Sequence, residues 1–244
     1  MKAQNASRTC PSTPRPSAAK TSRFHYYSTL AGAALALLCP APARATLAQY
    51  QAAVTNEPSL LSYYTFEQNN AADLKGAHPG TLAGTTAFTN GAGGFGRALA
   101  LGGAGWVNLG VVPDFAFTND NSGSIEAWVR AGTIGADACM FATREYGWTT
   151  RYSVHMASAK TQIGMWNGNY SGGYKTLAIA NASTNWHHLV VVFDSDKFTA
   201  YWDGTSAGSF TNALGNVTDR PTQIGNASPL AAEQPWIGAL DEVA

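Results

Sequence analysis

The amino-acid sequence predicts an all-β protein built as a sandwich or barrel, and three observations support this class. Short runs rich in β-branched and aromatic residues follow one another from residue 60 onward, separated by Gly, Asn, Asp and Pro. The 25 glycines supply turns between so many short strands. Beyond residue 59, apolar residues almost never recur with a helical period. No break in composition interrupts residues 60–244, so we expect them to form one domain.

The N-terminal 45 residues have the organisation of an export signal. A basic leader precedes a ten-residue apolar segment, Thr29–Leu38, and Ala43-Arg44-Ala45 fits the small-x-small cleavage rule. A membrane-spanning helix needs about 20 residues, so we expect removal after Ala45, secretion and no membrane anchor. Cys39 leaves a lipoprotein signal open, although its neighbours fit lipid attachment poorly. A misassigned start codon would also explain the long leader.

Removal of residues 1–45 changes the charge of the chain. They contain six of the 15 basic residues and none of the 15 acidic ones, so the remainder carries a net charge of −6. An acidic domain without a Lys/Arg cluster argues against nucleic acid or an anionic membrane as partner. Cys139 would be the remaining cysteine, which excludes an intrachain disulfide. Its apolar neighbours favour a buried strand thiol over a catalytic nucleophile.

A short helical lead-in, residues 46–59, precedes the strands. Leu47, Tyr50 and Val54 are spaced as one face of a helix. Asn56 and Pro58 would end it. The strands that we expect after it, in order, are Leu60–Glu67, Phe95–Leu101, Gly105–Leu109, Ser124–Arg130, Cys139–Thr143, Arg151–Met156, Thr161–Trp166, Lys175–Ala180, Trp186–Phe193, Phe198–Trp202, Ser206–Phe210, Gln223–Gly225 and Trp236–Ala244.

The clearest hairpin lies near the end of this series. Trp186–Phe193 is apolar on both faces, which is typical of a central strand, and Phe198–Trp202 alternates between two faces. Asp203-Gly204 then supplies the two positive φ angles of a tight turn. Adjacent side chains of a strand point to opposite faces, so His187 and His188 cannot bind one metal ion together. We expect one of them to be packed and the other to be hydrogen-bonded.

Eight segments in a fixed order resemble a known family. They are YYTFE, Asp73 with Gly76–Leu82, Gly96–Leu99 with Leu101–Gly103, Ile125–Val129, Trp186–Asp194, Tyr201–Gly204, Ile224-Gly225 and Gly238–Val243. Together they resemble the laminin-G-like, concanavalin A-like jelly-roll modules of secreted bacterial proteins. The resemblance implies two antiparallel sheets stacked face to face, with the first and last strands side by side. The last strand of such modules normally continues, so we expect the C-terminal edge to be truncated.

The resemblance also implies a possible metal site. If the first and last strands are neighbours, Glu67 and Asp241 meet at one edge, and Asp73 or loop carbonyls would complete a structural calcium site. The alternative is that Asp241 and Glu242 cap loops or pair with Arg97 or another base.

Two loops rich in aromatic residues are candidates for sugar binding. Aromatic faces stack on pyranose rings, and neighbouring amides and carboxylates hydrogen-bond the hydroxyls. Loops are also where binding residues concentrate. The alternative is that Trp148 and Tyr174 only cover the ends of the sandwich. We expect most of Trp106, Trp128, Trp186 and Trp202 to lie in the core. The candidate ligand-binding residues are Tyr146, Trp148, Trp166, Asn169, Tyr170 and Tyr174.

Evidence for catalysis is weak in the sequence. Retaining glycoside hydrolases need two carboxylates about 5 Å apart, which an alternating Glu-x-Asp-x-Glu strand would supply, and that pattern is absent. Glu126 stands alone on its strand, and we expect it to pair with Arg130. Nothing resembles a nucleophile elbow. We therefore expect a secreted, non-catalytic binding or adhesion module for carbohydrate or an extracellular protein. The alternatives are a glucanase-type hydrolase on the same fold and a structural spacer of a larger surface protein.

Overall fold

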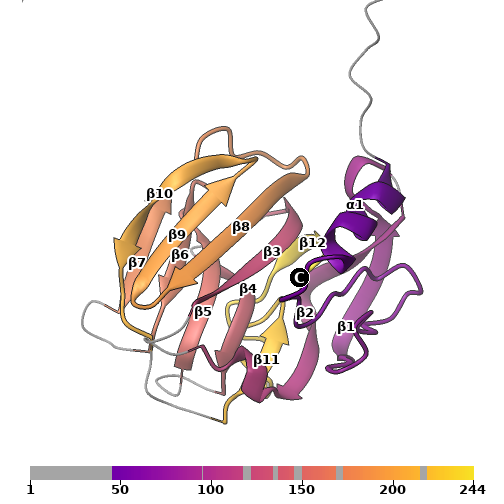
Figure 1. Ribbon diagram of the computed structural model, residues 1–244, viewed down its shortest axis with the longest axis horizontal. Coiled ribbons are helices and arrows are strands. Elements are labelled where there is room, and N and C mark those ends of the chain that lie inside the picture. Colours follow the sequence, from indigo (N-terminus) through magenta and orange to yellow (C-terminus); the bar gives the residue numbers. More distant parts are fainter. Residues whose placement is uncertain are drawn as a thin grey trace, which may run out of the picture. The chain divides into compact units, whose positions relative to one another are not determined.

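The computed structural model describes residues 46–94, 96–117, 122–133, 137–145, 150–168, 173–214 and 219–244. The expected export signal in residues 1–45 lies outside them. The described residues form one α-helix and twelve antiparallel strands, which are hydrogen-bonded into one sheet that curls into two layers (Figure 1). The helix is α1, Leu47–Thr55. The strands are β1 (Thr81–Asn90), β2 (Arg97–Val111), β3 (Ser122–Ala131), β4 (Asp137–Arg144), β5 (Thr150–Ala157), β6 (Gln162–Trp166), β7 (Tyr174–Ala178), β8 (His187–Asp194), β9 (Lys197–Trp202), β10 (Thr205–Thr211), β11 (Pro221–Ile224) and β12 (Ile237–Asp241).

Strand β2 joins the two layers. Its first half pairs with β12. β12 begins one layer, which has the strand order β12-β3-β8-β9-β10 and which we call the β8 layer. Its second half pairs with β11. β11 begins the other layer, which has the strand order β11-β4-β5-β6-β7 and which we call the β5 layer. β1 runs along the other edge of β2, with a register shift between Gly84 and Thr86. Gly105 is required at the bend, because a Cβ there would lie 2.1 Å from the Thr85 carbonyl oxygen.

The core lies between the layers. Ile125, Ala127 and Val129 of β3 are buried, while the residues between them are partly exposed. The buried side chains of the β8 layer belong to one continuous cluster with those of the β5 layer, such as Val154 and Met156. The expected all-β, two-sheet sandwich is therefore confirmed.

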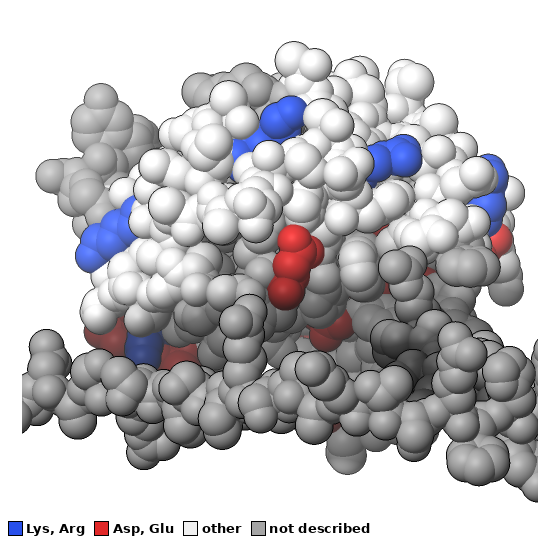
Figure 2. Space-filling view, turned by 90° about the horizontal axis from the view of Figure 1, so that it is seen from above, with Lys and Arg blue, Asp and Glu red and all other residues white. Residues whose placement is uncertain are grey.

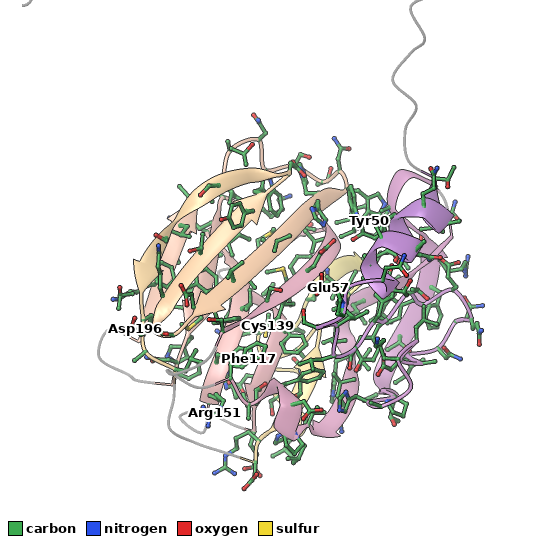
Figure 3. All side chains as sticks on the ribbon, viewed as in Figure 1. Tyr50, Glu57, Phe117, Cys139, Arg151 and Asp196 are labelled. Carbon is green, nitrogen blue, oxygen red and sulfur yellow. The ribbon has the colours of Figure 1, made fainter. Side chains whose placement is uncertain are left out.

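Helix α1 lies against the outer surface of the β8 layer (Figures 1 and 3). Thr46 and Gln49 form a capping box at its start, and Asn56 caps its end as expected. None of its residues is fully buried. The Tyr50 ring meets the rings of Trp128 and His188 edge-on, and polar contacts add to this. Tyr50 donates a hydrogen bond to Glu126, and Gln51 donates one of 2.8 Å to Glu242.

The first and last segments lie side by side, as the resemblance implied. However, Leu60–Glu67 is not a strand: its contact with the C-terminal segment is a single bridge between Tyr64 and Val243. Strand β1 was not expected, because its Thr- and Gly-rich sequence lacks apolar alternation. The two strands expected between Phe95 and Leu109 are one, β2.

The hairpin of β9 and β10 has the expected turn, with φ of 49° at Asp203 and 75° at Gly204. His187 and His188 point to opposite faces, as expected, but both form hydrogen bonds. His187 stacks on Trp202 and contacts Asp203.

The expected pair of Glu126 with Arg130 is wrong. His188 Nε2 lies 2.8 Å from Glu126 Oε1, and the Arg130 guanidinium lies over the Trp186 ring instead. Arg130 lies on the same face of β3 as Glu126. The neighbouring strand β8, however, places His188 closer to the Glu126 carboxylate. Trp106 and Trp202 are core residues as expected, whereas Trp128 and Trp186 are only half-buried.

No helix in the described ranges is long and apolar enough to cross a membrane. On the face shown in Figure 2, the Lys and Arg side chains lie apart from one another and form no patch.

Candidate functional site

The outer surface of the β5 layer, which we call the pocket face, is built by strand alternation. Val154, Met156, Ile163 and Met165 point into the core, so the residues between them point outward. Pairing across the strands places Ser153 opposite Trp166 and Trp166 opposite Tyr174, all on this outer face. Cross-strand register thus gathers side chains that are up to 21 residues apart in the sequence.

Trp166 and Tyr174, both candidate ligand-binding residues, line one pocket of about 500 Å³. Tyr174 is 37 % exposed, and its hydroxyl donates a 2.7 Å hydrogen bond to Asp137. Burial, that hydrogen bond and the charge of Asp137 all raise the pKa of the phenol. The pocket volume lies within the range of small-ligand sites, about 300–1,000 Å³. The remaining lining residues are Asp137, Arg144, His155, Glu233 and Gln234.

Arg144 forms one wall of the pocket. Its guanidinium lies over the Trp166 ring, with Cζ 4.5 Å from the ring centroid. It is also ion-paired with Glu233 and donates a 3.1 Å hydrogen bond to Gln234. The Arg144 side chain is 2 % exposed, so its charge is held inside the protein.

A loop between β11 and β12 holds Glu233 in position. The Glu233 backbone N–H donates a 2.9 Å hydrogen bond to the side-chain oxygen of Asn226, which is fully buried. The Asn226 amide in turn donates to the carbonyls of Ser228 and Ala231. Asn226 therefore organises the loop that carries the acidic wall of the pocket.

His155 lies beneath the pocket and is neutral. Burial, assisted by the charge of Arg144, lowers its pKa to about 3. Its Nε2 lies 2.6 Å from the Ser153 hydroxyl, while its Nδ1 has no hydrogen-bond partner among the described residues. Nearby Cys139 is fully buried, and burial raises the pKa of its thiol, as expected for a structural cysteine (Figure 3).

Sequence reasoning found only part of this site. Trp166 and Tyr174 are brought together, but Tyr146, Trp148, Asn169 and Tyr170 lie outside the described residues. The five polar lining residues were missed. Ser153 and His155 alternate with apolar residues, and this pattern could have predicted that both side chains point away from the core. Glu233 lies in a loop, where no periodic pattern predicts the direction of a side chain.

A larger cavity of about 900 Å³ lies between α1 and the end of the sandwich. Its walls are mostly apolar side chains such as Leu60, Phe117 and Phe141. Two carboxylates line it: Glu126 is bonded by Tyr50 and His188, and Glu57 accepts hydrogen bonds from Ser59. Sugar recognition needs polar groups beside an aromatic face. We take the pocket face as the candidate site because it places Trp166 and Tyr174 beside the charged side chains of its lining.

The predicted metal residues are brought together in part. Glu67 and Asp241 interact: burial raises the pKa of Asp241 to about 7, backbone hydrogen bonds oppose this, and the charge of Glu67 adds to it. Asp73 instead organises a turn by accepting hydrogen bonds from the backbone of Tyr63, Lys75 and His78. Over the described ranges, no three His, Cys, Asp or Glu side chains form a group that could hold a metal ion.

Ser183, His187 and Asp203 form a chain that resembles a catalytic triad. The Ser183 hydroxyl lies 2.8 Å from His187 Nε2, and His187 Nδ1 lies 2.7 Å from Asp203. The cavities described above do not include these residues. Asp203 also accepts a 2.9 Å hydrogen bond from the His188 backbone, and Ser183 accepts one from Asn185. These contacts fix two turns, which is a sufficient structural role.

Comparison with known sequences settles the family. A sequence profile of the concanavalin A-like lectin/glucanases superfamily, of the laminin G type, matches residues 101–244. The chain belongs to this superfamily. The matched segment contains every lining residue of the pocket on the outer surface of the β5 layer. No match is found among curated protein sequences.

Several solved structures share the fold at low sequence identity. Domain 4 of AbnA, an extracellular arabinanase from Geobacillus stearothermophilus solved with arabinotriose, has a TM-score of 0.58 at 18 % identity, over 75 % of this chain and 89 % of that one. Botulinum neurotoxin type C has a TM-score of 0.53 at 12 % identity, and the match covers 75 % of this chain and 46 % of that one. A Trypanosoma rangeli sialidase has a TM-score of 0.54 at 13 % identity, and the match covers 75 % of this chain and 30 % of that one. The chain thus spans less than half of the latter two proteins.

Proposed function

We propose that the chain is a secreted, non-catalytic carbohydrate-binding module whose ligand occupies the pocket face. The observation that carries this proposal is the joint placement of Trp166 and Tyr174 in one pocket with several hydrogen-bonding side chains. Aromatic rings beside polar groups match the alternating apolar and hydroxyl surfaces of a sugar. The arabinotriose bound by the arabinanase domain, and the gangliosides with which the neurotoxin interacts, support a glycan ligand.

A carbohydrate fits this pocket better than a folded protein. Stable protein interfaces bury about 800 Å² on each partner and need a broad surface. The pocket face instead presents an open pocket of about 500 Å³. A glycan chain can place one or a few rings in such a space.

A glycan array followed by calorimetric titration tests the proposal. We expect Trp166→Ala to abolish or weaken binding, because it removes a lining ring. Tyr201→Ala is the matched control, because Tyr201 is as exposed as Tyr174 but lies on β9 of the other layer. A silent array, or equal loss in the control, would contradict the proposal.

The hydrolase alternative would use the two carboxylates of the pocket, Asp137 and Glu233. Each is engaged, Asp137 by Tyr174 and Glu233 by Arg144, which favours a structural and binding role. We expect no release of reducing sugar from any oligosaccharide that binds. Release that disappears in both Asp137→Asn and Glu233→Gln would establish the hydrolase instead.

We also propose a structural calcium ion beside Glu67 and Asp241. Two carboxylates alone do not complete a site, so backbone carbonyls and water would supply the other ligands, which calcium accepts. Calcium should raise the melting temperature of the chelated protein, and more at alkaline than at acidic pH, because the ion must compete with the proton on Asp241. The absence of both a heat of binding and a melting shift would exclude the ion.

Residues 1–45 would direct export. Cleavage after Ala45 leaves Thr46, whose side chain caps α1, as the first residue. N-terminal sequencing of the protein recovered outside the producing cell should therefore begin at Thr46, and retention of residues 1–45 there would contradict the assignment.

A further inference from the structure

The charges around the pocket do not favour an acidic ligand. One guanidinium, Arg144, faces two carboxylates, Asp137 and Glu233. His155 adds no positive charge, because it stays neutral in its buried position. A ligand carboxylate entering the pocket would therefore meet an excess of negative charge.

Arg144, the one positively charged side chain among the described residues of the lining, already has partners within the protein. Arg144 is almost fully buried, ion-paired with Glu233, hydrogen-bonded to Gln234 and stacked on Trp166. Glu233 is held by Asn226 through a backbone hydrogen bond, so the pair is fixed by the fold and not by flexible surface side chains. A ligand carboxylate could reach the guanidinium only by displacing Glu233 and leaving a buried charge without its partner.

Two buried polar atoms of the lining residues, His155 Nδ1 and Glu233 Oε2, have no hydrogen-bond partner among the described residues. The His155 side chain lines the pocket, the residue is 1 % exposed, and Nδ1 has no partner among the described residues. A neutral imidazole presents either an N–H or a lone pair at Nδ1, according to the tautomer that its contact with Ser153 selects. A sugar hydroxyl both donates and accepts, so it can satisfy Nδ1 in either tautomer. A carboxylate only accepts.

We propose that the pocket face selects neutral oligosaccharides and rejects uronic and sialic acids, because the Arg144–Glu233 pair removes the cation that an acidic sugar needs. This inference rests on the proposed glycan-binding function. It assigns Glu233 a role as the residue that sets ligand charge, and His155 a role as the hydroxyl partner at the floor of the pocket.

The test uses matched glycans on the whole protein. The probes are oligogalacturonides and oligoglucuronides beside their carboxyl-reduced counterparts, and sialylated glycans beside the desialylated forms, together with neutral arabino-, xylo- and gluco-oligosaccharides. We expect binding only to neutral members, with the acidic member of any pair at least tenfold weaker. Binding of neutral glycans should also change little with salt, because no ligand charge is screened.

Glu233→Gln supplies the decisive variant. It keeps the size of the side chain but leaves the Arg144 charge without its ion partner, so the preference within a pair should shift toward the acidic glycan by tenfold or more. Glu145→Gln is the control, because Glu145 forms an ion pair with Arg220 and does not line the pocket. It should leave the preference unchanged.

The outcomes separate this inference from the function beneath it. Equal or tighter wild-type binding of an acidic member, or affinity that falls steeply with salt, overturns the charge selection but leaves glycan binding intact. An unchanged preference in a folded Glu233→Gln protein overturns the role of Glu233. Silence of the whole panel removes the binding function itself, and this inference with it.

Discussion

The ring of Tyr174 lies directly over Gly164, so that a Cβ built on the glycine would lie 2.8 Å from ring atoms. Gly164 pairs with His155 in the neighbouring strand, and the Tyr174 ring meets the His155 ring edge-on at 5.9 Å. The bare backbone of β6 thus creates the space in which the aromatic wall of the pocket rests.

Gly164→Ala should therefore weaken glycan binding without unfolding the protein. The added methyl group displaces the Tyr174 ring, and we expect a loss of affinity of about tenfold, comparable to losing one aromatic contact of ~1.4 kcal/mol. Calorimetric titration measures the loss. The control is Gly102→Ala, where a Cβ meets nothing within 4 Å. Unchanged affinity in Gly164→Ala would show that the position of Tyr174 does not matter for binding.

Substitutions at Tyr174 separate its ring from its hydroxyl. Tyr174→Phe keeps the aromatic surface and loses the hydrogen bond to Asp137, so affinity should fall only a few-fold. Tyr174→Ala should cost about tenfold or more, because the stacking surface itself is removed. If Tyr174→Phe loses as much affinity as Tyr174→Ala, the ring is not a sugar platform and only the hydroxyl contributes.

Glu242 should make the stability of the protein depend on pH. Burial raises its pKa from 4.5 to about 7, opposed by the hydrogen bond from Gln51. Between these values the folded state keeps a proton that the unfolded state has released, so this carboxyl's contribution is full below about pH 4.5 and is lost as the pH rises through 7. Glu242→Gln removes this dependence.

Denaturant unfolding of both proteins at acidic and alkaline pH measures the effect. The stability of the wild type relative to Glu242→Gln should decline from about pH 5 to about pH 8. A constant difference across this window would show that Glu242 titrates normally in the folded protein.

Ser183 should be unreactive toward a fluorophosphonate probe. Its hydroxyl contacts His187 at 2.8 Å, but it also accepts a hydrogen bond from the Asn185 backbone and serves the turn. We expect no covalent label by mass spectrometry in the native protein. A label at Ser183 that is lost in His187→Gln would reveal a hydrolytic site and contradict the structural role.

Tyr50→Phe should loosen α1 from the sandwich. A nine-residue helix with no buried side chain is marginal alone, and Tyr50 gives it a hydrogen bond to an ionised carboxylate. We expect a loss of about 1–2 kcal/mol of docking free energy, seen as faster proteolysis within residues 46–59. Tyr201→Phe is the control. Equal protection in both variants would show that the contact with Glu126 does not hold the helix.

Glu126 illustrates why a strand carboxylate is hard to interpret from sequence. Burial opposes its ionisation, but hydrogen bonds from His188 and Tyr50, together with the charge of His188, leave its pKa below the ordinary value. Neither partner lies on the same strand as Glu126, so spacing along β3 could not reveal them. The prediction that Arg130 pairs with Glu126 was wrong for this reason.

The sequence by itself determined the local features. Alternation of apolar residues located most strands, Asp203-Gly204 fixed the hairpin turn, and Asn56 ended α1, because each of these depends on near neighbours in the chain. The order of eight such segments was enough to indicate the concanavalin A-like family.

Only the tertiary structure decided how the pocket is composed. Arg144, His155, Trp166, Tyr174 and Glu233 come from four strands and one loop, and their contacts follow from the register across β4 to β7 and from the loop that Asn226 folds. Register is set by the packing of the opposite, core-facing side of each strand. The chemistry of the outer face is thus fixed by apolar contacts on the inner one, which a reading of individual residues does not show.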